Sequence, residues 1–220
     1  IIAIILIDFV IDKIVDALNA KKFNDPVPSE LSDVYDETEY TRSQNYKKER
    51  YYFGIITSSF SLITTLLFLY FDGFAFVDEI AANYTEIPIF RALLFFGIIM
   101  FASDILTLPF SYYSTFVIEE KYGFNKTTKK LFFLDKLKSW ALMAIVGGAI
   151  LSLIIWFYQI TENDFWWYAW ILVTVIILFT NMFYAKLIVP IFNKQSPLKE
   201  GSLRSKIEAY AEKVGFKLDN

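Results

Sequence analysis

The sequence predicts an all-α protein, a polytopic transmembrane helix bundle of about five spans followed by the start of a soluble helical segment. Apolar residues make up 55% and aromatic residues 19% of the 220 positions, and the mean hydropathy is +0.41, all well above the usual values of a soluble domain. Several apolar runs approach the roughly 20 residues that cross a bilayer. Charged residues are concentrated between these runs.

Residues 1–18 are predicted to form the first span. Asp8, Asp12 and Asp16 recur every four residues and place one polar stripe on an apolar helix. The stripe is either the wet face of a helix leaving the membrane, or it faces a water-filled interior, because intramembrane carboxylates seldom face lipid. The chain opens with Ile inside an apolar run, so we expect a longer precursor and a first span that is cut short.

The segment 21–50 is a polar connection to the second span, which we place at residues 51–71. Pro26 and Pro28 are expected to break the first helix, because proline removes a backbone donor and clashes with the preceding turn. A helix is expected to restart near Ser29, and residues 33–50, rich in Tyr and charge, are predicted to be a soluble helix that leads into the second span.

The third span is predicted at residues 88–110, after a short acidic loop over 72–87 that contains the glycosylation sequon Asn83-Tyr84-Thr85. Asp104 lies within this span. An acid at that depth is a functional-site hypothesis by default. The alternative is a helix cap or a partner for a lysine at the membrane interface, and the residues alone do not separate the two.

The fourth and fifth spans are predicted at residues 137–158 and 165–189, joined into a helical hairpin by a tight turn over 159–164. Pro190 should end or kink the fifth span. Residues 202–214 have one apolar face and predict the first helix of a soluble domain.

The distribution of basic residues predicts the orientation. Six Lys or Arg fall in residues 21–50, none in 72–87, six in 111–138, none in 159–164, and seven from residue 186 onward. Because basic residues accumulate in cytoplasmic loops, we expect an outside N-terminus, cytoplasmic loops at 21–50 and 111–136, and a cytoplasmic tail. The sequon at Asn83 then falls outside, and a second sequon at Asn125 falls inside and should be silent.

The rest of the chain is organised around the stretch 109–128. Gly123 marks a chain reversal, and Thr127 or Thr128 is expected to cap the following helix. Glu119 and Glu120 are adjacent, so on a helix they point about 100° apart. They cannot easily act as a pair on one substrate atom, and we expect them to be solvated and to position the loop.

The residues alone reveal no active site. The chain has no Cys and no His, so it offers no disulfide, no thiol nucleophile and no imidazole base. It has no HExxH motif, no Gly-rich phosphate loop and no acidic cluster with metal-ligand spacing.

The stretch 108–125, LPFSYYSTFVIEEKYGFN, resembles the signature loop of the integral-membrane zinc metalloproteases of the CAAX prenyl protease 1 type. Supporting similarity comes from VPSEL at 27–31, YTRSQNY at 40–46, VPIFNK at 189–194 and SPL at 196–198. Tyr122 stands where family members often have His. The signature residues taken as structural are Glu119, Glu120, Gly123, Phe124 and Asn125.

The resemblance implies that residues 1–195 are the five-span membrane domain of a zinc metalloendopeptidase, and that 196–220 begin a cytoplasmic catalytic domain that is truncated. Family members bind one Zn²⁺ through the two His of an HExxH helix and a later Glu. None of these positions exists here, so no catalytic or metal residue is carried over and this chain alone is expected to be inactive and to bind no zinc. In the family the spans enclose a chamber, which Asp8, Asp12, Asp16 and Asp104 could then face.

The resemblance also implies the partners: the lipid bilayer and a peptide or protein substrate, CaaX-type prenylated or membrane-associated, but no nucleic acid. The membrane would be the endoplasmic reticulum or a bacterial plasma membrane. A non-catalytic membrane scaffold is the main alternative. A small transporter is a further one, although the sequence shows neither the internal repeats nor the broken midmembrane helices typical of transporters.

Overall fold

The computed structural model describes residues 1–27, 36–161, 164–194, 196 and 198–216, and all regular structure in these residues is helical. The prediction of an all-α chain is confirmed. The chain divides into two compact units, Ile1–Trp156 and Phe157–Asn220, and each is described by itself.

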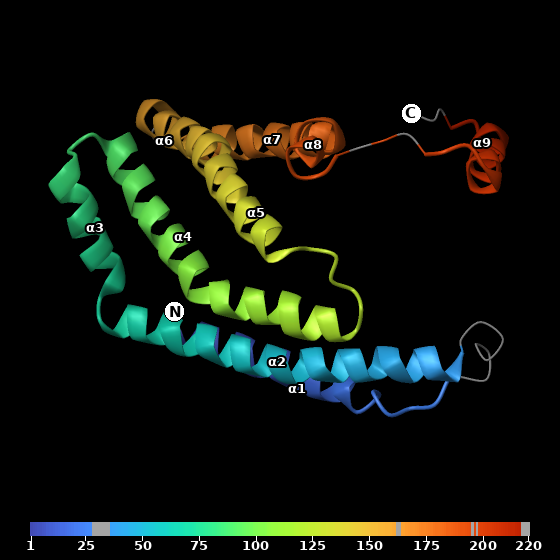
Figure 1. Cartoon of the computed structure of the whole chain (residues 1–220). Helices are drawn as coiled ribbons and strands as arrows, with labels where there is room; N and C mark the ends of the chain where they lie inside the picture. The colour runs from blue at the N-terminus through green and yellow to red at the C-terminus, as the bar shows by residue number, and fades with distance from the viewer. Residues whose placement is uncertain (28–35, 162–163, 195, 197, 217–220) are drawn as a thin grey trace. The chain divides into compact units, whose positions relative to one another are not determined.

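In the first unit, α1 (Ile2–Ala20) packs along α2 (Glu37–Tyr70) (Figure 1). α1 ends six residues ahead of Pro26. The predicted helix restart at Ser29, like Pro28, lies outside the described residues. α2 begins at a true cap, because the Asp36 carboxylate accepts a hydrogen bond from the backbone N–H of Thr38 at 3.2 Å.

The predicted acidic loop over 72–87 is wrong, because most of it forms α3 (Gly73–Tyr84). Gly73, Val77 and Ala81 are spaced by four and are buried, with Gly73 close to the ring of Phe68 on α2 and α3 packed chiefly against α4. An apolar stripe of this period gives a short helix one buried face. Asp78 on α3 accepts a hydrogen bond from the Arg91 Nε on α4 at 2.9 Å, which ties the two helices together (Figure 1).

The third apolar run continues beyond its predicted end at Phe110. α4 (Pro88–Tyr113) passes without interruption into the π-helical segment η2 (Ser114–Glu119), although Pro109 lies inside the helix. Proline removes one intrahelical hydrogen bond, and π-type turns commonly absorb such a disturbance. As a result Glu119 and Glu120 lie on a helix end rather than in a loop, and Ile118 is only 1% exposed.

A further long helix consists of α5 (Lys129–Leu142), the π-helical segment η3 (Met143–Gly147) and α6 (Gly148–Thr161), and its residues up to Trp156 complete the first unit. The predicted cap at Thr128 is confirmed, because its hydroxyl accepts a hydrogen bond from the backbone N–H of Leu131 at 3.2 Å. The helix therefore begins eight residues before the predicted span.

The second unit holds the end of α6, then α7 (Phe165–Leu187), α8 (Val189–Phe192) and α9 (Ser202–Val214). Pro190 lies at the start of α8, and α7 ends just before it, as predicted for a helix-ending proline. The predicted turn over 159–164 includes residues 162–163, which lie outside the described residues. α9 has the predicted bounds.

Among the residues that the structure describes, four helices are long and apolar enough to cross a membrane: Glu37–Tyr70, Pro88–Glu119, Lys129–Thr161 and Phe165–Phe192. α1 is not among them, because three aspartates and a lysine interrupt its apolar sequence. At a rise of 1.5 Å per residue, the 34 residues of α2 form a helix that is longer than the roughly 30 Å thickness of the hydrocarbon core of a bilayer. Its polar first third therefore extends beyond the lipid.

Candidate functional site

The main polar cluster of the first unit joins α2 to the end of η2 and the turn that follows. Arg42, Tyr46, Glu49 and Arg50 lie four, three and one residues apart on α2, so they share one face of that helix. This face packs against η2. Helical spacing on α2 and the extension of α4 through η2 together bring residues about 70 positions apart into contact.

Glu119 lies at the centre of one half of the cluster. Its Oε1 accepts a hydrogen bond from the Tyr46 hydroxyl at 2.6 Å and one from Arg50 Nη1 at 2.7 Å. Its backbone oxygen accepts from the N–H of Phe124 at 2.9 Å. A carboxylate with a charged partner and a phenol partner is firmly oriented, so Glu119 fastens the turn to α2.

Glu49 lies at the centre of the other half. Its Oε2 accepts a hydrogen bond from Lys121 Nζ at 2.7 Å and one from the Tyr122 hydroxyl at 2.8 Å. The carboxylate raises the pKa of Lys121, chiefly through this hydrogen bond. Burial raises the pKa of the Tyr122 phenol, and the hydrogen bond to Glu49 adds to that shift.

The turn itself is built on Gly123, whose φ is +76°, a conformation that favours glycine. A Cβ at this position would lie 3.2 Å from Arg42 Nη2, and that guanidinium donates a hydrogen bond to the backbone oxygen of Tyr122. The Phe124 ring then packs edge-on against Tyr46, with ring centroids 4.9 Å apart. The predicted turn is therefore present and closely packed on α2.

The adjacent carboxylates take different partners. Glu120 Oε2 accepts a hydrogen bond from the Asn125 side-chain amide at 2.6 Å, while Glu119 bonds to α2. Asn125 Oδ1 in turn accepts from the backbone N–H of Thr127 at 2.7 Å. This arrangement shapes the approach to α5, and the two acids do not converge on a common point.

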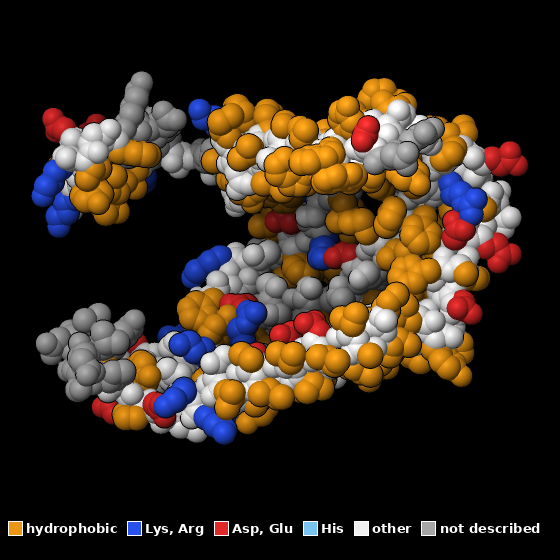
Figure 2. Space-filling view, turned by 180° about the vertical axis from the view of Figure 1, so that it is seen from behind, with side chains coloured by type: hydrophobic (Ala, Val, Ile, Leu, Met, Phe, Trp, Pro, Cys, Tyr) orange, Lys and Arg blue, Asp and Glu red, His pale blue; other side chains and the backbone are white. Residues whose placement is uncertain are grey.

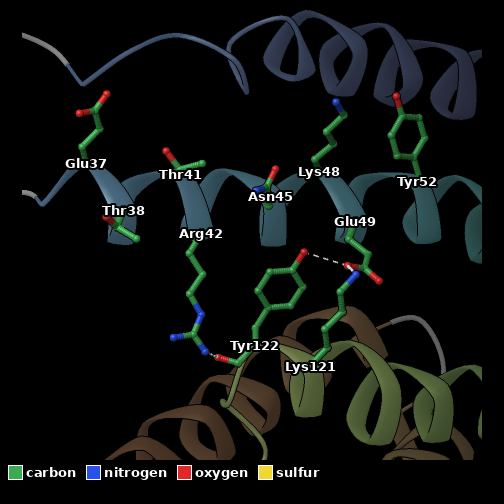
Figure 3. A pocket seen from close by; sticks show the side chains of 10 residues that line it. All are labelled: Glu37, Thr38, Thr41, Arg42, Asn45, Lys48, Glu49, Tyr52, Lys121 and Tyr122. Atoms are coloured by element: carbon green, nitrogen blue, oxygen red, sulfur yellow. Dashed lines mark hydrogen bonds and ion pairs between the residues drawn. The ribbon is translucent and has the colours of Figure 1, made fainter.

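Beside the cluster lies an open groove of about 960 Å³. Figure 3 shows Arg42 and Glu49 extending from α2 toward Tyr122 and Lys121, while Lys48 points to the opposite side of α2. The groove offers hydrogen-bond donors and charges of both signs. Within the described residues, no group of three His, Cys, Asp or Glu could hold a metal ion. The hydrogen bonds of the cluster join the turn to α2.

Asp104 has partners on a different helix. Its Oδ1 lies 2.7 Å from Lys136 Nζ, and its Oδ2 accepts a hydrogen bond from the Trp140 indole N–H at 2.8 Å. Both partners lie on α5, so Asp104 ties α4 to α5. An apolar cavity of about 660 Å³ is lined by Asp104 and Trp140 and by small residues, among them Gly97 and Gly147.

The three aspartates of α1 do not join either cluster. Asp8 and Asp12 are exposed, and Asp16 lies 2.7 Å from Lys13 Nζ within the same helix. The three aspartates thus lie at helical spacing on α1, as predicted. The ion pair that Asp16 forms is with a residue of the same helix.

Sequence reasoning missed the residues of α2 that hold the turn, namely Tyr46, Glu49 and Arg50. Their common helical face was a usable signal, because residues 33–50 were predicted to be helical, but no partner for that face was predicted. Lys136 and Trp140 were also missed, although their spacing of four placed them together on α5.

Comparisons with known proteins agree on one family. The family model described as "CAAX prenyl protease N-terminal, five membrane helices" matches residues 16–194. CAAX prenyl protease 1 of Saccharomyces cerevisiae is 34% identical over 203 residues, which are 88% of this chain and 45% of the yeast protein. The CAAX prenyl protease 1 homolog of Homo sapiens is 31% identical over 199 residues, 87% of this chain and 42% of the human protein.

The crystal structure of S. mikatae Ste24p has the same fold, with a TM-score of 0.90 and 32% sequence identity. The similarity covers 100% of this chain and 53% of the Ste24p chain. This chain therefore spans about half the length of the relatives it matches. With the multi-pass helical architecture and the match over 16–194, the chain belongs to the CAAX prenyl protease N-terminal family of membrane proteins.

Proposed function

We propose that this chain is the membrane-spanning portion of a zinc endopeptidase that cleaves CaaX-type prenylated or membrane-associated protein substrates. The observation that carries the proposal is the match to the N-terminal membrane domain of CAAX prenyl proteases across residues 16–194. The full-length fold similarity to Ste24p supports it.

The residues of this chain do not fit a zinc site. The sequence has no His and no Cys, and the described carboxylates form no cluster of three that could hold a metal. We therefore assign the zinc ligands and the catalytic base to the remaining half of the parent protein. The contribution of this chain is to bind the bilayer, frame the substrate path and support the catalytic part.

The polar cluster of α2 and η2 is proposed to act as the brace on the cytoplasmic side. Its charges, including Arg42, Arg50 and Lys121, belong to two of the three segments that hold most of the basic residues, the arrangement expected of cytoplasmic loops.

We place the N-terminus outside and residues 196–220 at the start of the cytoplasmic catalytic part. The proposed membrane is the endoplasmic reticulum, because the yeast and human relatives described above are eukaryotic. Asp8, Asp12, Asp16 and Asp104 remain proposed chamber-facing residues.

The test compares this 220-residue chain with its full-length parent, each purified in detergent. Zinc is measured by mass spectrometry beside the intact mass, and cleavage is followed with a farnesylated CaaX peptide. We expect one zinc and peptide cleavage for the parent, and neither for the 220-residue chain. A parent without HExxH, zinc or cleavage would support the scaffold function instead.

A further inference from the structure

The end of the first unit formed by α3 and the start of α4 is acidic. Asp78 and Glu79 lie on α3, and Glu86 lies just before α4. Figure 2 shows Asp and Glu side chains gathered around this end of the unit. Residues 72–87 contain no Lys or Arg, so this end faces away from the cytoplasm in the proposed orientation.

Asn83 lies in the last turn of α3 and heads the sequon Asn83-Tyr84-Thr85. Its side chain is exposed and forms no hydrogen bond with other described residues. Tyr84 is 81% exposed, whereas Ala81, on the face packed against α4, is fully buried. A large group attached to Asn83 would therefore project from the molecule without disturbing the α3–α4 contact.

The backbone leaves the helix where the acceptor lies. Thr85 is the C-cap of α3 and is extended, with φ −160° and ψ 139°. Its hydroxyl accepts a hydrogen bond from the N–H of Ile87 at 3.2 Å. The sequon therefore begins in the last turn of α3 and ends at an extended residue, with the Asn83 side chain exposed and Thr85 half-buried.

Asn83 also lies beyond a charged pair that joins α3 to α4. Asp78 and Arg91 form an ion pair between α3 and α4, and such charges are costly within hydrocarbon. Asn83 is five residues farther along α3 than Asp78, which at 1.5 Å per residue is about 7 Å beyond it. In the proposed orientation we place this pair at the outer membrane boundary, so that Asn83 falls on the non-cytoplasmic side.

We propose that Asn83 is an N-glycosylation site on the non-cytoplasmic face of the membrane. The co-substrate would be an oligosaccharide carried on a lipid pyrophosphate. The Asn83 amide nitrogen bonds to the sugar C1 as the bond from C1 to the pyrophosphate oxygen breaks. The lipid pyrophosphate leaves with the electron pair, and the amide proton passes to solvent. The proposal rests on the orientation in the proposed function and adds a modification to it.

The second sequon of the chain provides a matched internal control. Asn125 heads Asn125-Lys126-Thr127, but its side chain is half-buried and is held by Glu120 and the backbone of residue 127. It belongs to a basic segment, which the proposed orientation places in the cytoplasm. Asn83 should be modified and Asn125 should not.

The experiment expresses the full-length parent in eukaryotic cells and compares its gel mobility before and after an endoglycosidase that removes N-linked glycans. We expect one discrete downward shift for the unmutated protein, for Asn125→Gln and for Thr85→Ser, which keeps the sequon. Asn83→Gln and Thr85→Ala should migrate at the deglycosylated position. Peptide mass spectrometry should locate the converted residue at position 83.

A reporter sequon appended ahead of the N-terminus separates failure of this inference from failure of the orientation. A glycosylated reporter with an unmodified Asn83 would overturn the glycosylation site and leave the orientation intact. Modification at Asn125, or an unmodified reporter, would overturn both. Because Asn83 is exposed, its replacement by Gln should leave the protein folded, as thermal unfolding would confirm.

Discussion

Tyr122 and Glu49, 73 positions apart in the chain, are joined by a hydrogen bond of 2.8 Å from the phenol to the carboxylate. Tyr122 is only 9% exposed, although it follows the helix end and belongs to a turn. A single side chain in the turn thus reaches across to α2, and the same carboxylate holds Lys121 at 2.7 Å. The turn is therefore part of the packed structure of the first unit.

Removing the Tyr122 hydroxyl should weaken this junction. In Tyr122→Phe the ring and its contact with Tyr46, at a centroid distance of 5.2 Å, are kept, but Glu49 loses a donor. We expect a loss of about 1 kcal/mol in the free energy of unfolding, since a hydrogen bond to a charged group contributes on that order when partly exposed. Thermal unfolding in detergent, followed by far-ultraviolet circular dichroism, measures it.

The control for that substitution is Tyr84→Phe, which removes a phenol hydroxyl from a side chain that is 81% exposed. Its unfolding midpoint should match that of the unmutated chain. Equal midpoints for Tyr122→Phe and Tyr84→Phe would show that the hydrogen bond to Glu49 does not stabilise the fold.

Alkaline pH should loosen the same junction. The pKa of Lys121 is raised above its ordinary 10.5, first by the hydrogen bond to Glu49, and the pKa of Tyr122 is raised above 10.0, first by burial. Because both folded-state pKa values are raised, the stabilisation is complete below these ordinary values and is lost as pH rises through the folded-state values. Unfolding midpoints measured between pH 8 and roughly 11 should fall at the alkaline end.

The double variant Lys121→Met with Tyr122→Phe removes both titrating groups. It should start from a lower midpoint and decline less steeply over the same pH range. A decline as steep as that of the unmutated chain would assign the alkaline sensitivity to other groups.

The turn should also depend on Gly123. Gly123→Ala places a Cβ at φ +76° and 3.2 Å from Arg42 Nη2, so both backbone strain and the shift of Arg42 lower stability, by roughly 1–2 kcal/mol for the backbone part. Gly54→Ala is the matched control on α2, because a Cβ there meets nothing within 4 Å and alanine favours a helix. Unfolding midpoints should therefore drop for Gly123→Ala and hold or rise for Gly54→Ala. A drop of equal size in both would contradict the special role of Gly123.

Local patterns predicted much of the fold, because each depends on neighbours in the sequence. The apolar runs marked the long helices, Thr128 capped α5, and Pro190 followed the end of α7. The helix before α4 was mispredicted as a loop because the segment is short and contains four acids and no basic residue, although Val77 and Ala81 have helical spacing. Their burial comes from α4, a partner that a single-segment pattern does not contain.

The specific partner residues of Glu119 and Asp104 could not be predicted for the same reason, although a lysine was one of the partners considered for Asp104. Each carboxylate was noticed by its type and depth, but its role is set by a residue on another helix, Arg50 for one and Lys136 for the other. The end of α4 was also misplaced, since a proline normally ends a helix and here the helix continues through η2. The partners of both carboxylates are thus determined by contacts between helices, which no local sequence pattern contains.

A double-mutant cycle on Asp104 and Lys136 would separate the two roles considered for Asp104. Asp104→Asn keeps an acceptor for the Trp140 indole but removes the charge that faces Lys136 at 2.7 Å. With both side chains about one quarter exposed, we expect each single variant, Asp104→Asn or Lys136→Met, to lose about 2 kcal/mol, because a partly buried charge is left unpaired. The double variant should lose less than the sum, with a coupling of about 1 kcal/mol.

Cleavage of a farnesylated CaaX peptide by the full-length parent provides the second measurement on this cycle. If Asp104 only ties α4 to α5, the double variant should recover cleavage in proportion to its recovered stability. If its charge acts on the substrate path, stability should return while cleavage remains low, because Asn cannot replace the negative charge. Additive losses of stability in the cycle would refute the ion pair as a structural tie between the two helices.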